Sequence, residues 1–258
     1  MSGILQALTF VGGFLLFAVV GVLVVRRLVH HHVAEGHNDV LVPLFLTAGV
    51  IYAVLLGFMV VAVWESYDAA HETAALEAAT LIPLYRDTGD MSPVPGAKMR
   101  GLLREYAEEV ATGEWKSLET TGHASEKART ISGDVLRVFG TLNPTTKIRE
   151  IIDAQFLSTY SDLLIQRNKR LLQASESLSW VMWLGAIGGG IVVIGMSFII
   201  YMDTTWPHVL MVGVMAGLIG LLMFMMSVLS HPFVGPLALE PAPFEASLKV
   251  FDDIDKGH

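Results

Sequence analysis

Four long apolar segments constrain this chain more than any other feature of its sequence. They cover residues 5–25, 41–64, 178–201 and 209–229, and none of them contains Asp, Glu, Lys or Arg. Each is close to the ~20 residues that an α-helix needs to cross a bilayer. A soluble domain does not require four such helices, so we expect an all-α integral membrane protein with four transmembrane helices.

The charged residues are concentrated between the second and third apolar segments. Only 16% of the chain is charged, yet 13 of its 17 Lys and Arg residues lie at positions 86–170. The patterns in this stretch are helical, so we expect a helical extramembrane domain inserted between helices two and three. The expected divisions are residues 1–65 with transmembrane helices 1 and 2, 66–177 with the helical domain, 178–230 with transmembrane helices 3 and 4, and 231–258 as a C-terminal tail.

The expected helices of the extramembrane domain follow from breakers and apolar spacing. Helix two should continue past the membrane, because no breaker follows it before Pro83 or Gly89. A turn at 90–96 precedes a helix with an approximate apolar stripe, and a shorter helix covers 127–139. The longest helix should begin at Asn143–Pro144 and run straight into the third apolar segment. A short amphipathic segment at 244–254 ends the chain.

Composition and motifs exclude several classes of function. The chain has no cysteine, which rules out disulfides and thiol catalysis. In the central domain the acidic residues slightly outnumber the basic ones, so we expect no nucleic-acid partner. No phosphate-binding loop, nucleophile elbow or dinucleotide fingerprint is present. We therefore expect no enzymatic activity and no cofactor.

Glycines in the apolar segments predict close helix packing. The pairs Gly185-xxx-Gly189 and Gly213-xxx-Gly217 allow two helix backbones to approach each other. Such a contact can lie within one subunit or between subunits, and the spacing does not distinguish them.

Two signals for the membrane orientation oppose each other. Arg26 and Arg27 follow the first helix, which favours a cytoplasmic first link and an extracytoplasmic helical domain. Arg167, Lys169 and Arg170 precede the third helix and favour a cytoplasmic domain. Because the first helix usually dominates, we expect the domain to be extracytoplasmic.

Charged side chains follow the second apolar segment at its membrane boundary. Glu65, Asp68, His71 and Glu72 lie at i, i+3, i+6 and i+7, on one broad face of a helix. They could bind a divalent cation, collect inorganic ions at a pore mouth, or gate it through the imidazole. The alternative is an ordinary solvated helix face.

The link between the first two helices is rich in histidine. His30, His31, His32 and His37, with Glu35 and Asp39 nearby, could bind zinc or nickel, although such links more often bind metal adventitiously. The sequence thus leaves a metal site undecided. Asn38 and Asp39 are also suited to cap the second helix.

Several motifs together resemble a widespread bacterial family of four-helix membrane proteins labelled bestrophin-like. They include Asn38-Asp39, the second-helix motif with Tyr52, Gly57, Phe58, Trp64, Glu65, Tyr67 and Asp68, then Glu77 and Tyr85-Arg86, residues 167–172, and Pro232-Phe233-x-Gly235. The resemblance implies a multi-pass protein of the bacterial inner membrane. It also implies a relation to bestrophins, which are pentameric anion channels in animals with cation-passing bacterial relatives.

We expect a homo-oligomeric channel, because four spans without buried charges are unlike a proton-coupled carrier and too few to enclose a pore. Helix two would line the pore, with Phe58 or Trp64 near a constriction and Glu65 and Asp68 at a mouth that favours cations over anions. We expect Tyr85 and Arg86 to pack the base of the domain, with Arg86 meeting Glu77 or Asp68. The alternative is a non-conducting, membrane-anchored sensor or partner-binding module.

Overall fold

The computed structural model describes residues 3–29, 37–142 and 146–257, and these ranges contain helices and turns but no strand. The expected all-α fold is therefore confirmed. The chain divides into two compact units: unit 1 comprises Met1–Ser66 and Ser177–Ser230, and unit 2 comprises Tyr67–Glu176 and His231–His258. The tail after the fourth apolar helix thus belongs to the helical unit.

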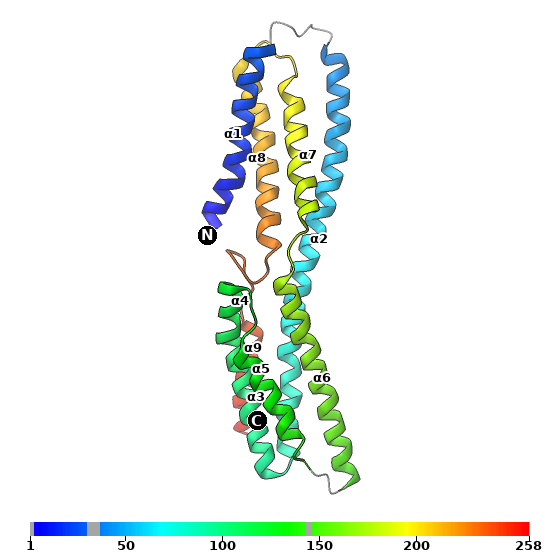
Figure 1. Ribbon diagram of the computed structural model, residues 1–258, viewed down its shortest axis with the longest axis vertical. Helices are drawn as coiled ribbons and strands as arrows, with labels where there is room; N and C mark the ends of the chain where they lie inside the picture. The colour runs from blue at the N-terminus through cyan, green and yellow to red at the C-terminus, as the bar shows by residue number, and fades with distance from the viewer. Residues whose placement is uncertain (1–2, 30–36, 143–145, 258) are drawn as a thin grey trace. The chain divides into compact units, whose positions relative to one another are not determined.

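Unit 1 is formed by four helices that are long and apolar enough to cross a membrane. They are α1 (Gly3–Val29), the first half of α2 (Asn38–Asp87), α7 (Trp180–Phe198) and α8 (Thr205–Leu229). Figure 1 shows α1, α7 and α8 running side by side. The expected four transmembrane helices are present as candidate spans.

Glycines allow the closest approaches within unit 1. A Cβ atom on Gly220 of α8 would lie 2.8 Å from the Cα atom of Val11 of α1, so these two backbones touch. A Cβ atom on Gly189 would lie 2.5 Å from the ring of Tyr52 on α2, whereas Gly213 and Gly217 lie against Leu15 of α1 at ordinary contact distance. The residues of both predicted glycine pairs therefore face helices of the same chain.

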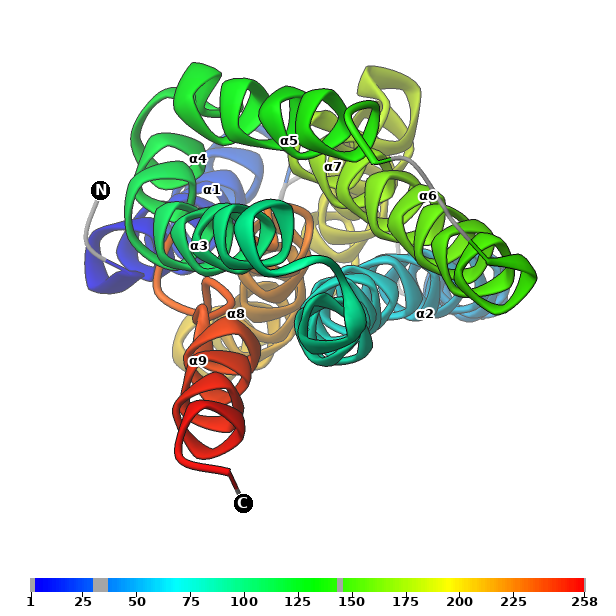
Figure 2. The ribbon, with the colours of Figure 1, turned by 90° about the horizontal axis from the view of Figure 1, so that it is seen from below.

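Unit 2 packs shorter helices against one face of the second half of α2. In chain order these are η2 (Thr88–Asp90), α3 (Pro93–Glu109), the π-helical turn η3 (Val110–Glu114), α4 (Trp115–Thr121), α5 (Glu126–Phe139), α6 (Lys147–Ser175) and α9 (Ala242–Asp255). Figure 2 shows α3, α5, α6 and α9 of unit 2 from below. Their shared core is rich in buried aromatic side chains: Tyr85, Tyr106, Trp115, Phe156, Tyr160, Phe244 and Phe251.

One helix boundary agrees with expectation and one does not. Helix α2 ends at Asp87, between the expected breakers Pro83 and Gly89, and it passes through Pro83 with Leu81 and Leu84 fully buried on either side. The prediction that the longest helix runs straight into the third span is wrong: α6 ends at Ser175 and α7 begins at Trp180. The hydroxyl oxygen of Ser179 accepts a hydrogen bond from the amide of Val181, so a serine cap starts α7 anew. The expected start of α6 at 143–144 lies outside the described residues.

The π-helical turn explains why the apolar stripe of this region was only approximate. Tyr106 and Val110 are buried four residues apart, but the next large buried apolar residue, Trp115, follows after five. Because the π-helical turn holds one residue more than an α-helical turn, Trp115 still points into the core. Glu114, four residues after Val110, belongs to this turn and is also fully buried.

Candidate functional site

One face of α2 carries an uninterrupted pattern of exposed residues with spacings of three and four. Its members are Ile51, Val54, Phe58, Val61, Glu65, Asp68 and Glu72, and all are exposed. A repeat that averages 3.5 residues keeps these side chains on one face of the helix and suits left-handed packing of helices. We call this the α2 stripe. It is apolar up to Val61 and acidic from Glu65 onward.

Some of the predicted pore residues lie on the α2 stripe and others lie beside it. Phe58, Glu65, Asp68 and Glu72 belong to it, and the Phe58 side chain is 73% exposed. Trp64 and His71 are also exposed but lie on a neighbouring face, since they are one position away from stripe members. The three carboxylates have no ion pair or hydrogen-bond partner in the described part of the chain.

No metal site built from histidine and carboxylate ligands is assembled within one chain in the ranges that the structure describes. These ranges hold no group of three or more His, Asp or Glu side chains that could bind a metal ion. The acidic residues of α2 would need a second copy, or a metal of low coordination, to form one. His30, His31, His32 and Glu35 lie outside the described residues.

Asn38, the first motif residue of α2, makes a contact between helices of unit 1. The amide of Asn38 bonds the backbone of Tyr201 twice: its nitrogen donates to the carbonyl oxygen and its oxygen accepts from the amide, both at 2.9 Å. This ties the start of α2 to the link between α7 and α8.

The other motif residues of α2 lie in different surroundings. Asp39 is exposed, and Gly57 lines a shallow pocket of about 320 Å³ whose walls are otherwise apolar. The Tyr67 hydroxyl donates to the carbonyl oxygen of Leu237 at 2.8 Å.

The polar centre of unit 2 is a buried network of two carboxylates and two guanidinium groups. Arg170 of α6 makes a bidentate pair with Glu77 of α2, at 2.6 Å from Nε and 3.0 Å from Nη2. Its Nη2 also donates to Glu114 at 2.6 Å, and Arg167 donates to the other oxygen of Glu114 at 2.6 Å. The side chains of Glu77, Glu114 and Arg170 are fully buried. Four charges from α2, η3 and α6 therefore meet in the core and sum to zero.

Neighbouring groups complete this network. The hydroxyl of Tyr106 donates to Glu77 at 2.7 Å, and the backbone amide of Ser125 donates to Glu114 at 3.0 Å. The guanidinium of Arg170 lies over the rings of Trp115 and Phe244, 5.6 and 5.7 Å from their centroids. Such contacts favour a planar, delocalised cation over a lysine ammonium.

Electrostatics keep the network charged although it is buried. Burial by itself lowers the pKa of Arg170, but the carboxylates of Glu77 and Glu114 outweigh it and hold the pKa above its usual value. Burial and the negative charge of Glu77 together raise the pKa of Tyr106 well above 10, so Tyr106 stays a hydrogen-bond donor. The arrangement is suited to joining three helices, since every oxygen of the two carboxylates accepts a hydrogen bond.

Sequence reasoning missed this network, although its signal was present. Arg167 and Arg170 continue the buried α6 series that runs through Phe156, Tyr160 and Leu163 at spacings of four and three. A charged residue at a core position of a helical stripe indicates a buried partner of opposite charge. The predicted pairing of Arg86 with Glu77 or Asp68 is wrong: Arg86 is exposed and makes no ion pair with a described residue, because Arg170 occupies Glu77.

The C-terminal segment is fastened to unit 2 by the last motif residues. Phe233 is buried and packs edge-on against Trp115, whose indole nitrogen donates to the carbonyl oxygen of Leu239 at 2.7 Å. The turn closes with a 2.7 Å hydrogen bond from the Leu239 amide to the Pro232 carbonyl oxygen. Gly235 has φ of 106°, which a side chain would disfavour.

Helix α9 then docks through an aromatic and ionic cluster. Tyr85 stacks on Phe251 with centroids 3.9 Å apart, and its hydroxyl donates to Asp255 at 2.7 Å. Arg100 and Arg104 of α3 pair with Asp255 at 3.0 and 2.9 Å. Tyr85 thus packs α9 against the base of the domain.

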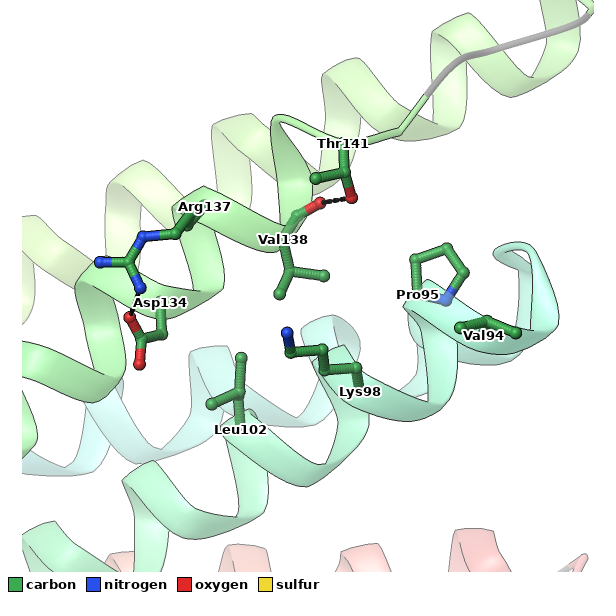
Figure 3. Close-up of a pocket in the computed structure, with 8 residues that line it drawn as sticks. All are labelled: Val94, Pro95, Lys98, Leu102, Asp134, Arg137, Val138 and Thr141. Carbon is green, nitrogen blue, oxygen red and sulfur yellow. Dashed lines mark hydrogen bonds and ion pairs between the residues drawn. The ribbon is translucent and has the colours of Figure 1, made fainter.

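A groove between α3 and α5 has a volume of about 510 Å³. Figure 3 shows Lys98 reaching from α3 toward α5, with the ion pair of Arg137 and Asp134 beside it. The Thr141 hydroxyl donates to the carbonyl oxygen of Val138. The other lining residues are apolar, and the only carboxylate in this lining is already paired.

These features define an α-helical membrane protein with a helical unit of its own outside the apolar spans. A model of the Bestrophin-like domain matches residues 12–244. The chain therefore belongs to the Bestrophin-like family, a family of channel-like membrane proteins. Its fold is also similar to that of a membrane protein solved as a crystal structure, with a TM-score of 0.70 and 12% identity, over 96% of this chain and 98% of that chain. A comparison with curated proteins finds no match.

Proposed function

We propose that this protein forms a homo-oligomeric channel whose pore is lined by the α2 stripe and favours cations over anions. The stripe carries the proposal, because it is a long face of α2 that is exposed along its length and changes from apolar to acidic. Within unit 1, α1, α7 and α8 pack on one another, while α2 is attached through Tyr52 and Asn38. Copies of α2 gathered around an axis would bury the stripe.

The proposed pore has a gate and a mouth. A ring of Phe58 side chains would form an apolar constriction, a form of gate that excludes water when narrow. Trp64, beside the stripe, would pack between neighbouring copies. Rings of Glu65 and Asp68 would lie at the mouth, where repeated negative charge concentrates cations and repels anions. Glu72 adds a third carboxylate without an ion-pair partner among the described residues, whereas Glu77 is buried and paired with Arg170.

The first test is ion flux through the purified protein in liposomes. We expect K⁺ or Na⁺ flux to exceed Cl⁻ flux, and Glu65→Gln/Asp68→Asn to reduce that preference several-fold. The matched control is Glu150→Gln/Asp153→Asn, which removes two acids at the same i, i+3 spacing on α6. A protein that conducts no ion, and that purifies with a stoichiometric partner, would instead be the membrane-anchored binding module.

We further propose the bacterial inner membrane as its location, with unit 2 on the extracytoplasmic side. Arg26 and Arg27 support this orientation, and the opposing signal is weaker than the sequence suggested, because Arg167 and Arg170 are committed to the buried network. The chain has no cysteine, so a single cysteine introduced at an exposed position would be the only thiol available for labelling. Glu119→Cys should react with a membrane-impermeant maleimide in spheroplasts; labelling only after lysis would reverse the orientation.

A further inference from the structure

His208, near the start of α8, is a buried imidazole with one nitrogen in use. The residue is 3% exposed, and its Nε2 lies 3.0 Å from the carbonyl oxygen of Ser197. A carbonyl oxygen only accepts, so Nε2 carries the proton and the neutral ring keeps a lone pair on Nδ1. No described residue provides a hydrogen bond to that lone pair.

The end of α7 makes this arrangement possible. If the helix continued, the amide of Tyr201 would donate to the carbonyl oxygen of Ser197. Instead it donates to the side chain of Asn38, at 2.9 Å. The carbonyl oxygen of Ser197 is therefore accessible to His208, and the imidazole is oriented by backbone.

Three methionines line the same pocket as His208. The pocket has a volume of about 240 Å³, and its lining includes Met202, Met211 and Met215. His208, Met211 and Met215 stand at i, i+3 and i+7, on one face of α8, while Met202 comes from the link before it. No Asp or Glu belongs to the lining.

We propose that this pocket binds a monovalent soft metal ion, Cu⁺. Thioether sulfur and imidazole nitrogen are ligands that favour Cu⁺, and a lining without carboxylates disfavours the hard ions Mg²⁺ and Ca²⁺. A metal-binding histidine characteristically donates its other N–H to a carboxylate or backbone carbonyl, as His208 does. Neutral ligands in an apolar pocket also hold one positive charge more readily than two.

The methionines of this pocket differ from the packing methionines of the same helix. Met223 and Met226 are almost fully buried and fill the core of unit 1. Met211, by contrast, is 64% exposed, and all three pocket methionines border open space. Their flexible side chains are free to converge on an ion.

The test is Cu⁺ binding by the full-length protein in detergent, measured by competition with a chromophoric Cu⁺ chelator. The key variant is Met211→Leu/Met215→Leu, which keeps side-chain volume and leaves the buried His208 untouched. The control is Met225→Leu, a partly exposed methionine of α8 outside the pocket. Each protein also carries His30→Asn/His31→Asn/His32→Asn, so that the histidine-rich link does not compete.

We expect the parent and the control to bind one equivalent of Cu⁺ and the double variant to bind at least tenfold more weakly. Ag⁺, which is redox-inert, should raise the melting temperature of the first two proteins but not of the double variant. Absence of Cu⁺ binding by the parent, or equal affinity in the double variant, would overturn the site. Neither result depends on ion flux, so the channel proposal stands or falls separately.

Discussion

At the scale of single residues, the informative positions are charged groups in the core. The two guanidinium groups and two carboxylates of unit 2 are stable only as a set, because each satisfies groups that burial has removed from water. Two atoms, Nη1 of Arg170 and Nε of Arg167, are buried without a protein partner among the described residues. Most polar atoms of the network therefore have a hydrogen-bond partner. Removing one charged side chain would leave a buried charge without its counter-ion.

Substituting Arg170 should be among the most damaging single changes in unit 2. Arg170→Met fills similar space but leaves two buried carboxylates facing one arginine, so we expect a loss of about 3–5 kcal/mol in the free energy of unfolding. Chemical denaturation in detergent, followed by tryptophan fluorescence, measures it. Arg129→Met is the matched control, since Arg129 is 73% exposed and its pair with Glu126 lies on the surface. Equal stability of the two variants would show that the network contributes nothing.

At the scale of elements, α9 is held by contacts that depend on charge. Asp255 accepts hydrogen bonds from Tyr85 and Arg104 and faces Arg100. Partial burial alone would raise the pKa of Asp255, but these hydrogen bonds and the arginine charges outweigh it and lower the pKa below its ordinary 3.8. Docking of α9 therefore gains from the ionised carboxylate.

The attachment of α9 should weaken at low pH. An acid whose pKa is lower in the folded state stabilises it above the ordinary pKa, and that contribution is lost as the pH falls through the lowered value. We expect α9 amides to lose protection from hydrogen exchange below about pH 4, and Asp255→Asn to show faster exchange already at pH 7 with little further change on acidification. Asp253→Asn, whose side chain is 64% exposed, is the control. Identical pH profiles for the parent and Asp255→Asn would contradict this role.

The sequence predicts a structural element well when the interactions that form it are local in the sequence. The four apolar helices and the extension of α2 follow from composition, which acts within one segment. The break between α6 and α7 coincides with three closely spaced serines, at positions 175, 177 and 179. The apolar periodicity on both sides led us to predict one continuous helix instead. The pairing of Glu77 with Arg170 joins residues 93 positions apart, and the return of Trp115 to the core five residues after Val110 requires a π-helical turn that the residue pattern did not predict. Of the predicted ion site, only the face of α2 is visible in one chain; its assembly remains a prediction.

At the scale of the whole molecule, the proposal requires several copies around a common axis. Bismaleimide cross-linking tests this, because the chain has no native cysteine. Phe58→Cys on the α2 stripe should yield cross-linked dimers in membranes, because a single cysteine per chain can join only two neighbouring copies. Leu46→Cys, which is 60% exposed on another face of α2, should yield mainly monomer. A purified protein that is monomeric, with no cross-linking at either position, would contradict the oligomeric channel.

The π-helical turn has an evolutionary consequence. A π turn accommodates one residue more than the α-helix around it needs, so it is the structural trace of a single inserted residue. Deleting one residue between Val110 and Glu114 would convert the segment to a regular α-helix in which Trp115 follows Val110 after four positions and still faces the core. The helical segments on both sides of the turn would keep their buried faces. Among descendants of a common ancestor, a one-residue gap at this turn should therefore be found together with retained Arg167 and Arg170.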